Sequence, residues 1–234
     1  MVNRILEQLL HIEKELFFQL NGSDSLYWDH FFYLYSYKWT WLLFYACFFL
    51  VFIYKNKWKE IVCVLLAIVL VVLFCDQISS GFFKPFFHRF RPTHHPEFKN
   101  MVDTVLGYRG GKYGFISSHA ANAFGFMTFA ALLFRNRIFS YCIALFAIIN
   151  AFSRIYLGVH FISDVIVGAV VGAIMGCLVY KLYNYVRWKF LKHPKETLKQ
   201  PVYSARRAYF LCASYTVILL TLLLLNSKLI IFFT

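Results

Sequence analysis

Residues 153–164 read SRIYLGVHFISD, between apolar runs at 138–152 and 165–180 that contain no charged residue. These twelve residues include Arg154, His160 and Asp164. If the second half of the stretch is helical, the histidine and the aspartate are four residues apart and share a face. The carboxylate can then hydrogen-bond one ring nitrogen and leave the other free to attack or to take a proton. Charged groups at the edge of a membrane span are costly, so the stretch marks a candidate site.

The composition is that of a membrane protein. Of the 234 residues, 60% are hydrophobic and only 15% are charged, whereas a soluble domain carries roughly a quarter charged residues. The formal net charge of +13 suggests either nucleic acid or an acidic lipid surface as a partner. The distribution of the basic residues along the chain decides between them.

Six stretches are long and apolar enough to cross a membrane. Upstream of them, residues 4–20 repeat apolar side chains at helical spacing, with most charges on other faces, which is typical of a helix lying on the membrane surface. We therefore expect an all-α fold: a single integral-membrane domain over 1–234, an amphipathic segment at 1–27 and a bundle of about six helices. The predicted spans lie at about 38–54 (or from near Trp28), 60–83, 117–134, 138–156, 161–186 and 208–232.

Lys and Arg concentrate in three alternate connections between these spans, the turns at 55–59 and 135–137 and the linker at 181–207. The positive-inside rule makes these connections cytoplasmic. Both termini and the connections at 84–116 and 156–160 then lie on the outer, periplasmic face of the cytoplasmic (inner) membrane. This arrangement explains most of the net charge without a nucleic-acid partner.

We expect no metal and no other cofactor. The six cysteines lie in apolar runs without the spacing of metal ligands: Cys47, Cys63, Cys75, Cys142, Cys177 and Cys212. A metal site at His88, His94 and His95 is the less favoured alternative, because no spaced carboxylates or thiols accompany these histidines. Basic residues of the same connection fit either a solvated loop or recognition of a lipid headgroup: Arg89, Arg109 and Lys112.

Two more polar clusters lie at span ends on the predicted outer face. KPFFHRFRP at 84–92 ends the second span, and FISSHA at 115–120 begins the third. Three cations can neutralise a phosphate dianion, and a serine with backbone amides at a helix N-terminus adds neutral donors. One histidine could attack phosphorus while the other protonates the leaving oxygen. The sequence therefore predicts a phosphate site made of Lys84, Arg91, Ser117, His119, Arg154, His160 and Asp164.

These three clusters together resemble the type 2 phosphatidic acid phosphatase (PAP2) superfamily, which shares its site with vanadium haloperoxidases and bacterial acid phosphatases. Motif one, Lys-x6-Arg-Pro, and motif three, Ser-Arg-x5-His-x3-Asp, match in full. Motif two departs, with Ile116 where the family usually has Pro and Ser118 where it has Gly. We interpret the departure as a variant active site in which the geometry of this turn is the open point.

The resemblance implies a role for each matching residue. His160 would be the nucleophile that forms a phosphohistidine, Asp164 would orient it, and His119 would be the general acid and later the base for water. The phosphate oxygens would be bound by Lys84, Arg91, Arg154, Ser117 and the backbone amide of Ser118. The resemblance also implies a haloperoxidase-like helical core and, since family relatives need none, no metal.

The expected function is hydrolysis of a phosphate group on a membrane lipid. The sequence ISSHAAN at 116–122 and the amphipathic N-terminal segment resemble bacterial lipid A phosphatases of the 4′ type, which makes a lipid A phosphate the favoured substrate. Undecaprenyl diphosphate, phosphatidylglycerol phosphate and phosphatidic acid are alternative substrates. A second enzymatic hypothesis is a lipid phosphotransferase, which would pass the phosphate to another lipid. A non-catalytic lipid-phosphate binder or transporter is a third, against which the intact His119, His160 and Asp164 argue. The sequence leaves the oligomeric state open.

Overall fold

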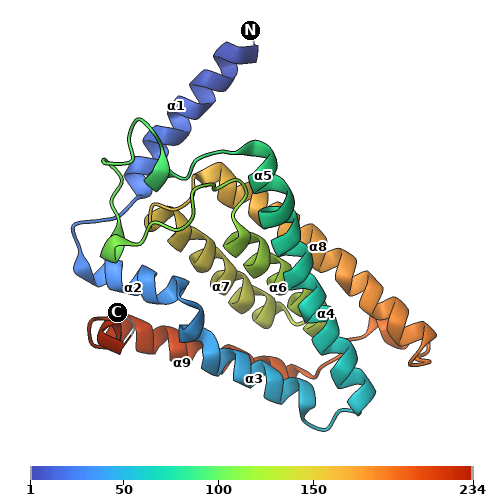
Figure 1. Cartoon of the computed structure of the whole chain (residues 1–234). Coiled ribbons are helices and arrows are strands. Elements are labelled where there is room, and N and C mark those ends of the chain that lie inside the picture. The colour runs from blue at the N-terminus through green and yellow to red at the C-terminus, as the bar shows by residue number, and fades with distance from the viewer. Residues whose placement is uncertain (1, 233–234) are drawn as a thin grey trace.

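The computed structural model of the protein describes residues 2–232. Within this range the regular elements are helices joined by turns and loops, with one isolated bridge between Phe90 and Tyr113. The predicted all-α fold is confirmed (Figure 1). The α-helices of the described range are α1 (Val2–Leu20), α2 (Leu26–Ser36), α3 (Leu42–Ile53), α4 (Trp58–Asp76), α5 (Lys84–Phe87), α6 (Ser118–Phe134), α7 (Arg137–Tyr156), α8 (Ile162–Lys189) and α9 (Ala205–Leu229).

Within residues 2–232, four helical stretches are long and apolar enough to cross a membrane, which confirms a multi-pass protein: Trp58–Phe87, Arg137–Tyr156, Ile162–Lys189 and Ala205–Phe232. The pair Leu26–Ser36 and Lys38–Ile53 would be a fifth span, bent by 67°. α6 is apolar but only 17 residues long. Every predicted span thus falls on a helix. A count of six is compatible with the structure, although the first span is broken and the third is short.

The bend in the first span has a local cause. Tyr37 adopts an extended backbone between α2 and the 3₁₀ turn Lys38–Trp41, so the regular helical hydrogen bonds stop there. The indole nitrogen of Trp41 donates to the carbonyl oxygen of Tyr35 at 2.8 Å and satisfies one of the acceptors that the break exposes. The early start near Trp28 therefore belongs to a separate helix, α2.

A stripe of glycines on α8 sets the distance between α8 and α6. A Cβ atom added at Gly172 would lie 2.1 Å from the carbonyl oxygen of Ala121, and one at Gly168 would lie 2.6 Å from that of Ser117. Small residues let the backbones of membrane helices approach closely. As a result Ser117 N donates to Asp164 O at 2.9 Å, and motif two is fixed against motif three.

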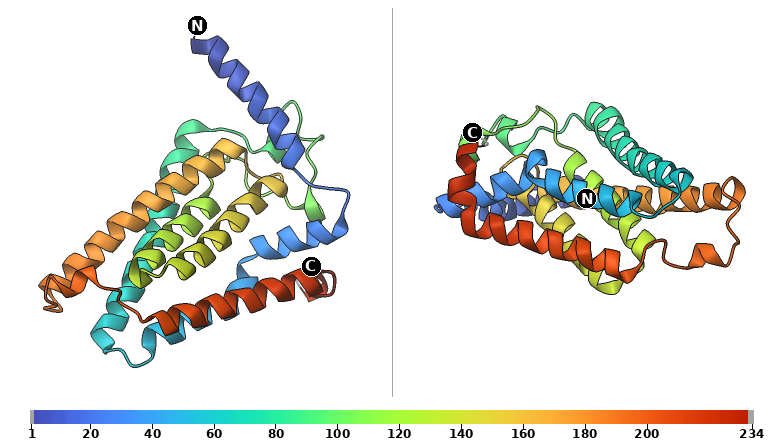
Figure 2. Two further views of the ribbon diagram at one scale, coloured as in Figure 1. Left: turned by 180° about the vertical axis from the view of Figure 1, so that it is seen from behind. Right: turned by 90° about the horizontal axis from the view of Figure 1, so that it is seen from below.

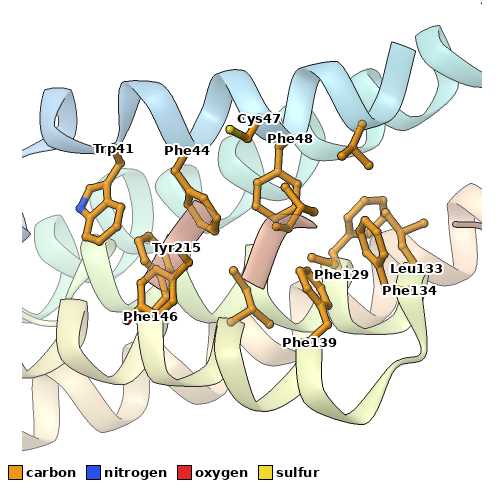
Figure 3. Close-up of a cluster of buried hydrophobic side chains, with 14 of the residues drawn as sticks. Trp41, Phe44, Cys47, Phe48, Phe129, Leu133, Phe134, Phe139, Phe146 and Tyr215 are labelled. Atoms are coloured by element: carbon orange, nitrogen blue, oxygen red, sulfur yellow. The ribbon is translucent and has the colours of Figure 1, made fainter. Parts of the chain in front are cut away.

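Aromatic side chains of α3, α7 and α9 form a buried cluster (Figure 3). Phe44 and Phe48 of α3 point toward α6 and α7, where they meet Phe146 and Phe139 at ring-centroid distances of 5.7 and 6.2 Å. Tyr215 of α9 completes the cluster, 5.8 Å from Phe44. The candidate site residues lie outside this apolar region.

The motifs gather at the end of the bundle that carries α1 and the long connection 88–117 (Figures 1 and 2). α4 continues through the π-helical segment Gln77–Phe83 into α5, which brings Lys84 to this end. The turn after α1 is tied to the connection, since the Asn21 side chain donates to Asp103 O at 3.0 Å and accepts from Asp103 N at 2.9 Å. The N-terminal helix and the site connection thus form one structural unit.

Candidate active site

His160 and Asp164 lie at the start of α8 and are buried, with exposed fractions of 1% and 0%. His160 Nδ1 is 3.4 Å from Asp164 Oδ2, which is long for a hydrogen bond. The same oxygen accepts from Phe161 N at 3.0 Å, and the other carboxylate oxygen accepts from Arg89 Nη1 at 2.8 Å. The carboxylate therefore faces one ring nitrogen of the histidine, and Nε2 remains for chemistry.

The imidazole of His160 is prepared to act as a neutral base or nucleophile. Burial and the neighbouring cations, Arg91 first among them, hold its pKa well below the ordinary value. Since that value is about 6.5, the ring is uncharged at neutral pH. An uncharged imidazole has a free lone pair on one nitrogen, which nucleophilic attack requires.

Motif two forms the first turn of α6. Ser117 is the N-cap residue, and its hydroxyl accepts from Ala120 N at 3.4 Å. His119 is exposed and lines a hollow of about 210 Å³, so it can reach a bound molecule. The residues around this hollow are Tyr33, Ser36, Tyr37, Lys38, Tyr108, His119, Arg154 and Leu157. The arrangement suits a leaving group that sits beside His119.

The hydroxyl of Ser118, absent from the usual family motif, is the acceptor for motif one. Lys84 Nζ donates to Ser118 Oγ at 2.6 Å and to Ser80 Oγ at 3.1 Å. Ser79 Oγ and Ser80 Oγ also contact Ser118 Oγ, at 2.8 and 3.0 Å. The departure in motif two is thus part of a hydrogen-bonded group that orients the lysine.

We expect Ser118→Gly to raise KM for a phosphomonoester about three- to tenfold and to leave kcat nearly unchanged. Lys84 loses one orienting hydrogen bond, worth on the order of 1 kcal/mol, but keeps its charge and its bond to Ser80. Steady-state kinetics would measure KM and kcat separately. Ser140→Gly, in the first turn of α7, is the control. A large loss of kcat would mean instead that the hydroxyl takes part in the chemistry.

Arg154, in the last turn of α7, is a buried cation with an exposed fraction of 1%. Its guanidinium donates to the hydroxyl groups of Ser36 and Tyr108, and its Nε is buried without a hydrogen-bond partner. Burial and the nearby charge of Arg154 lower the pKa of Arg91 to about 10. Arg91 is therefore still charged at neutral pH although Arg154 lies nearby.

Within the described residues, none of Lys84, Arg91 and Arg154 forms an ion pair with a carboxylate. Lys84 bonds only hydroxyl groups, and Arg91 Nε donates to the carbonyl oxygen of Tyr113 at 3.1 Å. Buried charges are normally paired because their desolvation is costly. Three unpaired cations around a neutral histidine make a site for an anion with more than one negative charge.

Comparisons with known proteins agree with this geometry. The sequence matches the family model described as the PAP2 superfamily over residues 62–188, more than half of the chain. The chain belongs to the PAP2 superfamily. The resemblance seen in the three motifs is confirmed.

This PAP2 protein has relatives that carry the name lipid A 4′-phosphatase. The one from Porphyromonas gingivalis is 48% identical over 186 residues, which cover 80% of this chain and 79% of the relative. The one from Bacteroides thetaiotaomicron is 38% identical over 178 residues, which cover 75% and 79%.

Two solved structures are also similar. LpxE from Aquifex aeolicus has a TM-score of 0.53 and 27% identity, covering 71% of this chain and 93% of that one. A PAP2-type phosphatidylglycerolphosphate phosphatase from Bacillus subtilis has a TM-score of 0.58 and 19% identity, covering 78% and 89%. At that identity the second structure supports the fold alone.

The PAP2 motifs do not account for every polar residue near the dyad. Arg89, for which the sequence offered a solvated loop or a headgroup contact, instead pairs with Asp164 and with Glu13 of α1. Ser36 and Tyr108, which bind Arg154, were not predicted either. No local pattern marks these contacts, because each joins segments far apart in the sequence.

The histidines of the connection 88–117 do not form a cluster of metal ligands. Among the residues that the structure describes, no group of three or more His, Cys, Asp or Glu side chains could hold a metal ion. His95 stacks on Phe98 with a centroid distance of 3.9 Å, and His94 Nδ1 lies 3.2 Å from Thr93 Oγ1. The alternative reading of these histidines as metal ligands therefore finds no support.

Proposed function

We propose that this protein is an integral-membrane phosphatase that removes a phosphate group from lipid A. The observation that carries the proposal is the set of three cations, Lys84, Arg91 and Arg154, that lack carboxylate partners beside the neutral His160. A phosphate dianion supplies the missing charge. The names of the two curated relatives favour lipid A over other phosphorylated lipids.

The proposed reaction has two steps. His160 Nε2 attacks phosphorus, the bond from phosphorus to the lipid oxygen breaks, and His119 donates a proton to that oxygen. His119 then takes a proton from water, which attacks the phosphohistidine and releases inorganic phosphate and free His160. Asp164 holds the imidazole by its Nδ1–H, and the three cations stabilise the charge on the transferring group.

We propose that the whole chain, residues 1–234, forms one domain.

Purified protein in detergent should convert bisphosphorylated lipid A to a monophosphorylated product and free phosphate. Mass spectrometry of the lipid and a phosphate assay would follow the reaction. The same preparation with a metal chelator should be equally active, because the proposed steps use only protein cations. Binding of the lipid without phosphate release would favour a non-catalytic binder or transporter. Transfer of the phosphate to an added lipid would favour a phosphotransferase.

The same assay distinguishes the lipid substrates. Undecaprenyl diphosphate, phosphatidylglycerol phosphate and phosphatidic acid are the alternatives, and each would be offered at the same mole fraction as lipid A. A kcat/KM for any of them that exceeds the value for lipid A would contradict the proposed substrate. The catalytic residues would then keep their roles.

We propose that the protein lies in the inner membrane with its active site on the periplasmic face. The support is the excess of Lys and Arg in the connections at the other end of the bundle. A cysteine at Gly111→Cys, where an added Cβ meets no atom within 4 Å, should react with an impermeant maleimide in cells with a permeabilised outer membrane. Glu196→Cys should react only after lysis, and the opposite labelling would reverse the topology.

A further inference from the structure

Helix α1 contacts the start of α8 through Phe17 and Glu13. Phe17 has an exposed fraction of 0% and lies edge-on to Phe161, with ring centroids 5.4 Å apart. One turn earlier, Glu13 Oε1 accepts from Ser163 N at 2.8 Å. That amide belongs to the first turn of α8, whose unpaired N–H groups and helix dipole favour a carboxylate.

The other oxygen of the same carboxylate holds Arg89. Arg89 Nη2 donates to Glu13 Oε2 at 2.6 Å, and Nη1 donates to Asp164 Oδ1 at 2.8 Å and to Ser163 Oγ at 2.6 Å. The guanidinium also lies over the ring of Phe161, 4.4 Å from its centroid. A continuous set of charge-assisted hydrogen bonds thus runs from α1 to the carboxylate beside His160.

We infer that Glu13 and Arg89 are positioning residues for Asp164, so that α1 takes part in arranging the proposed catalytic dyad. The inference rests on the phosphatase function proposed above. An arginine beside a single carboxylate commonly forms a bidentate pair with it, with two parallel hydrogen bonds. Because Nη2 of Arg89 is bonded to Glu13, only Nη1 contacts Asp164, and it contacts only Oδ1. Oδ2 is left for Phe161 N and for His160 Nδ1.

Loss of Glu13 changes this division in two ways. Both Nη atoms of Arg89 can then donate to the two carboxylate oxygens of Asp164, and this moves Oδ2 away from His160. The amide of Ser163 also loses its acceptor, and the first turn of α8 loosens. Asp164 remains paired with Arg89 after both changes. The alignment of His160 with Asp164 is therefore altered although the ion pair is kept.

The adjoining face of α1 is apolar and exposed. It carries Ile5, Leu9, Ile12 and Leu16, with exposed fractions between 44% and 59%, as expected of a helix that rests on a bilayer surface. The contacts of Glu13 therefore join a membrane-facing element to the dyad. This gives the N-terminal segment a role in turnover beyond attachment to the membrane.

The experiment compares Glu13→Ala with Glu15→Ala, which removes the same charge from an exposed position whose ion pair is with His11. Phosphate release is measured on lipid A and on p-nitrophenyl phosphate, a soluble substrate without acyl chains. Glu13→Ala is expected to lower kcat on both substrates by about 10-fold or more with KM unchanged. Glu13→Gln, which keeps one acceptor oxygen, should be intermediate, and Glu15→Ala should match the wild type. Thermal unfolding in detergent verifies that each variant is folded.

Two kinetic outcomes overturn the inference. A rise in KM for lipid A alone, with normal turnover of p-nitrophenyl phosphate, would make α1 a lipid-binding element only. Wild-type kcat on both substrates would remove the positioning role altogether. If the wild type itself releases phosphate from neither substrate, the proposed function fails, and a measurement without turnover decides the positioning role.

That measurement is nitrogen-15 NMR of histidine-labelled protein. The His160 signals are assigned by their loss in His160→Ala. Glu13→Ala should shift the Nδ1 resonance of His160, since the contact with Asp164 Oδ2 changes, and Glu15→Ala should not. An unchanged His160 spectrum in folded Glu13→Ala would contradict the inference whether or not the protein is an active phosphatase.

Discussion

Replacing His160 by alanine should abolish phosphate release, with a loss of at least about a thousandfold in kcat. The side chain is buried beside Asp164, and its pKa is held well below the ordinary value by burial and by the surrounding cations. It is therefore the uncharged group best placed to attack phosphorus. Without it water must attack directly, and the covalent path closes.

The matched control is His11→Ala, which removes an exposed histidine from α1. It should turn over lipid A and p-nitrophenyl phosphate at the wild-type rate. Residual activity of His160→Ala above about a tenth of the wild-type rate would exclude the nucleophile role, since removal of a nucleophile costs far more than tenfold.

Replacing Arg154 by alanine should lower kcat/KM by about 10²- to 10³-fold, the usual effect of removing one preorganised donor from a transition state. Its Nε is buried without a partner, and its fork is held by Ser36 and Tyr108. Arg154→Lys should recover only part of the loss, because a lysine keeps the charge but not the planar fork.

Thermal unfolding separates this effect from damage to the fold. Inorganic phosphate should raise the Tm of the wild type, because a ligand that binds the native state stabilises it. The same phosphate should raise the Tm of Arg154→Ala much less. Arg137→Ala, at the exposed start of α7, is the control and should behave as the wild type. An undiminished phosphate shift in Arg154→Ala would mean that this arginine does not bind the anion.

Much of the fold and of the motif placement was predictable from the sequence. Apolar length located the spans, and the alternation of spans required motifs one, two and three to meet at one end. The structure brings them together, with Lys84 bound to Ser118 and Ser117 N bound to Asp164 O. These predictions succeeded because they depend on helical periodicity and span direction, which are local properties of the chain.

The contacts that orient the site were not predictable in the same way. Periodicity places Glu13 on the polar face of an amphipathic helix, but it does not say what that face meets. Its bond to Arg89 joins residues 76 positions apart and depends on how α1 docks through Phe17. The break at Tyr37 was not located either, since the sequence left the start of the first span open between Trp28 and residue 38.

The most direct test of the account is to trap the reaction intermediate. Enzyme mixed with radiolabelled substrate, quenched in alkali and digested, should yield a phosphohistidine peptide that contains residue 160. With labelled p-nitrophenyl phosphate, whose leaving group needs little protonation, the amount should increase in His119→Ala, where attack by water is slower. Label on residue 119, or steady turnover without any labelled histidine, would contradict the proposed role of His160 as the nucleophile.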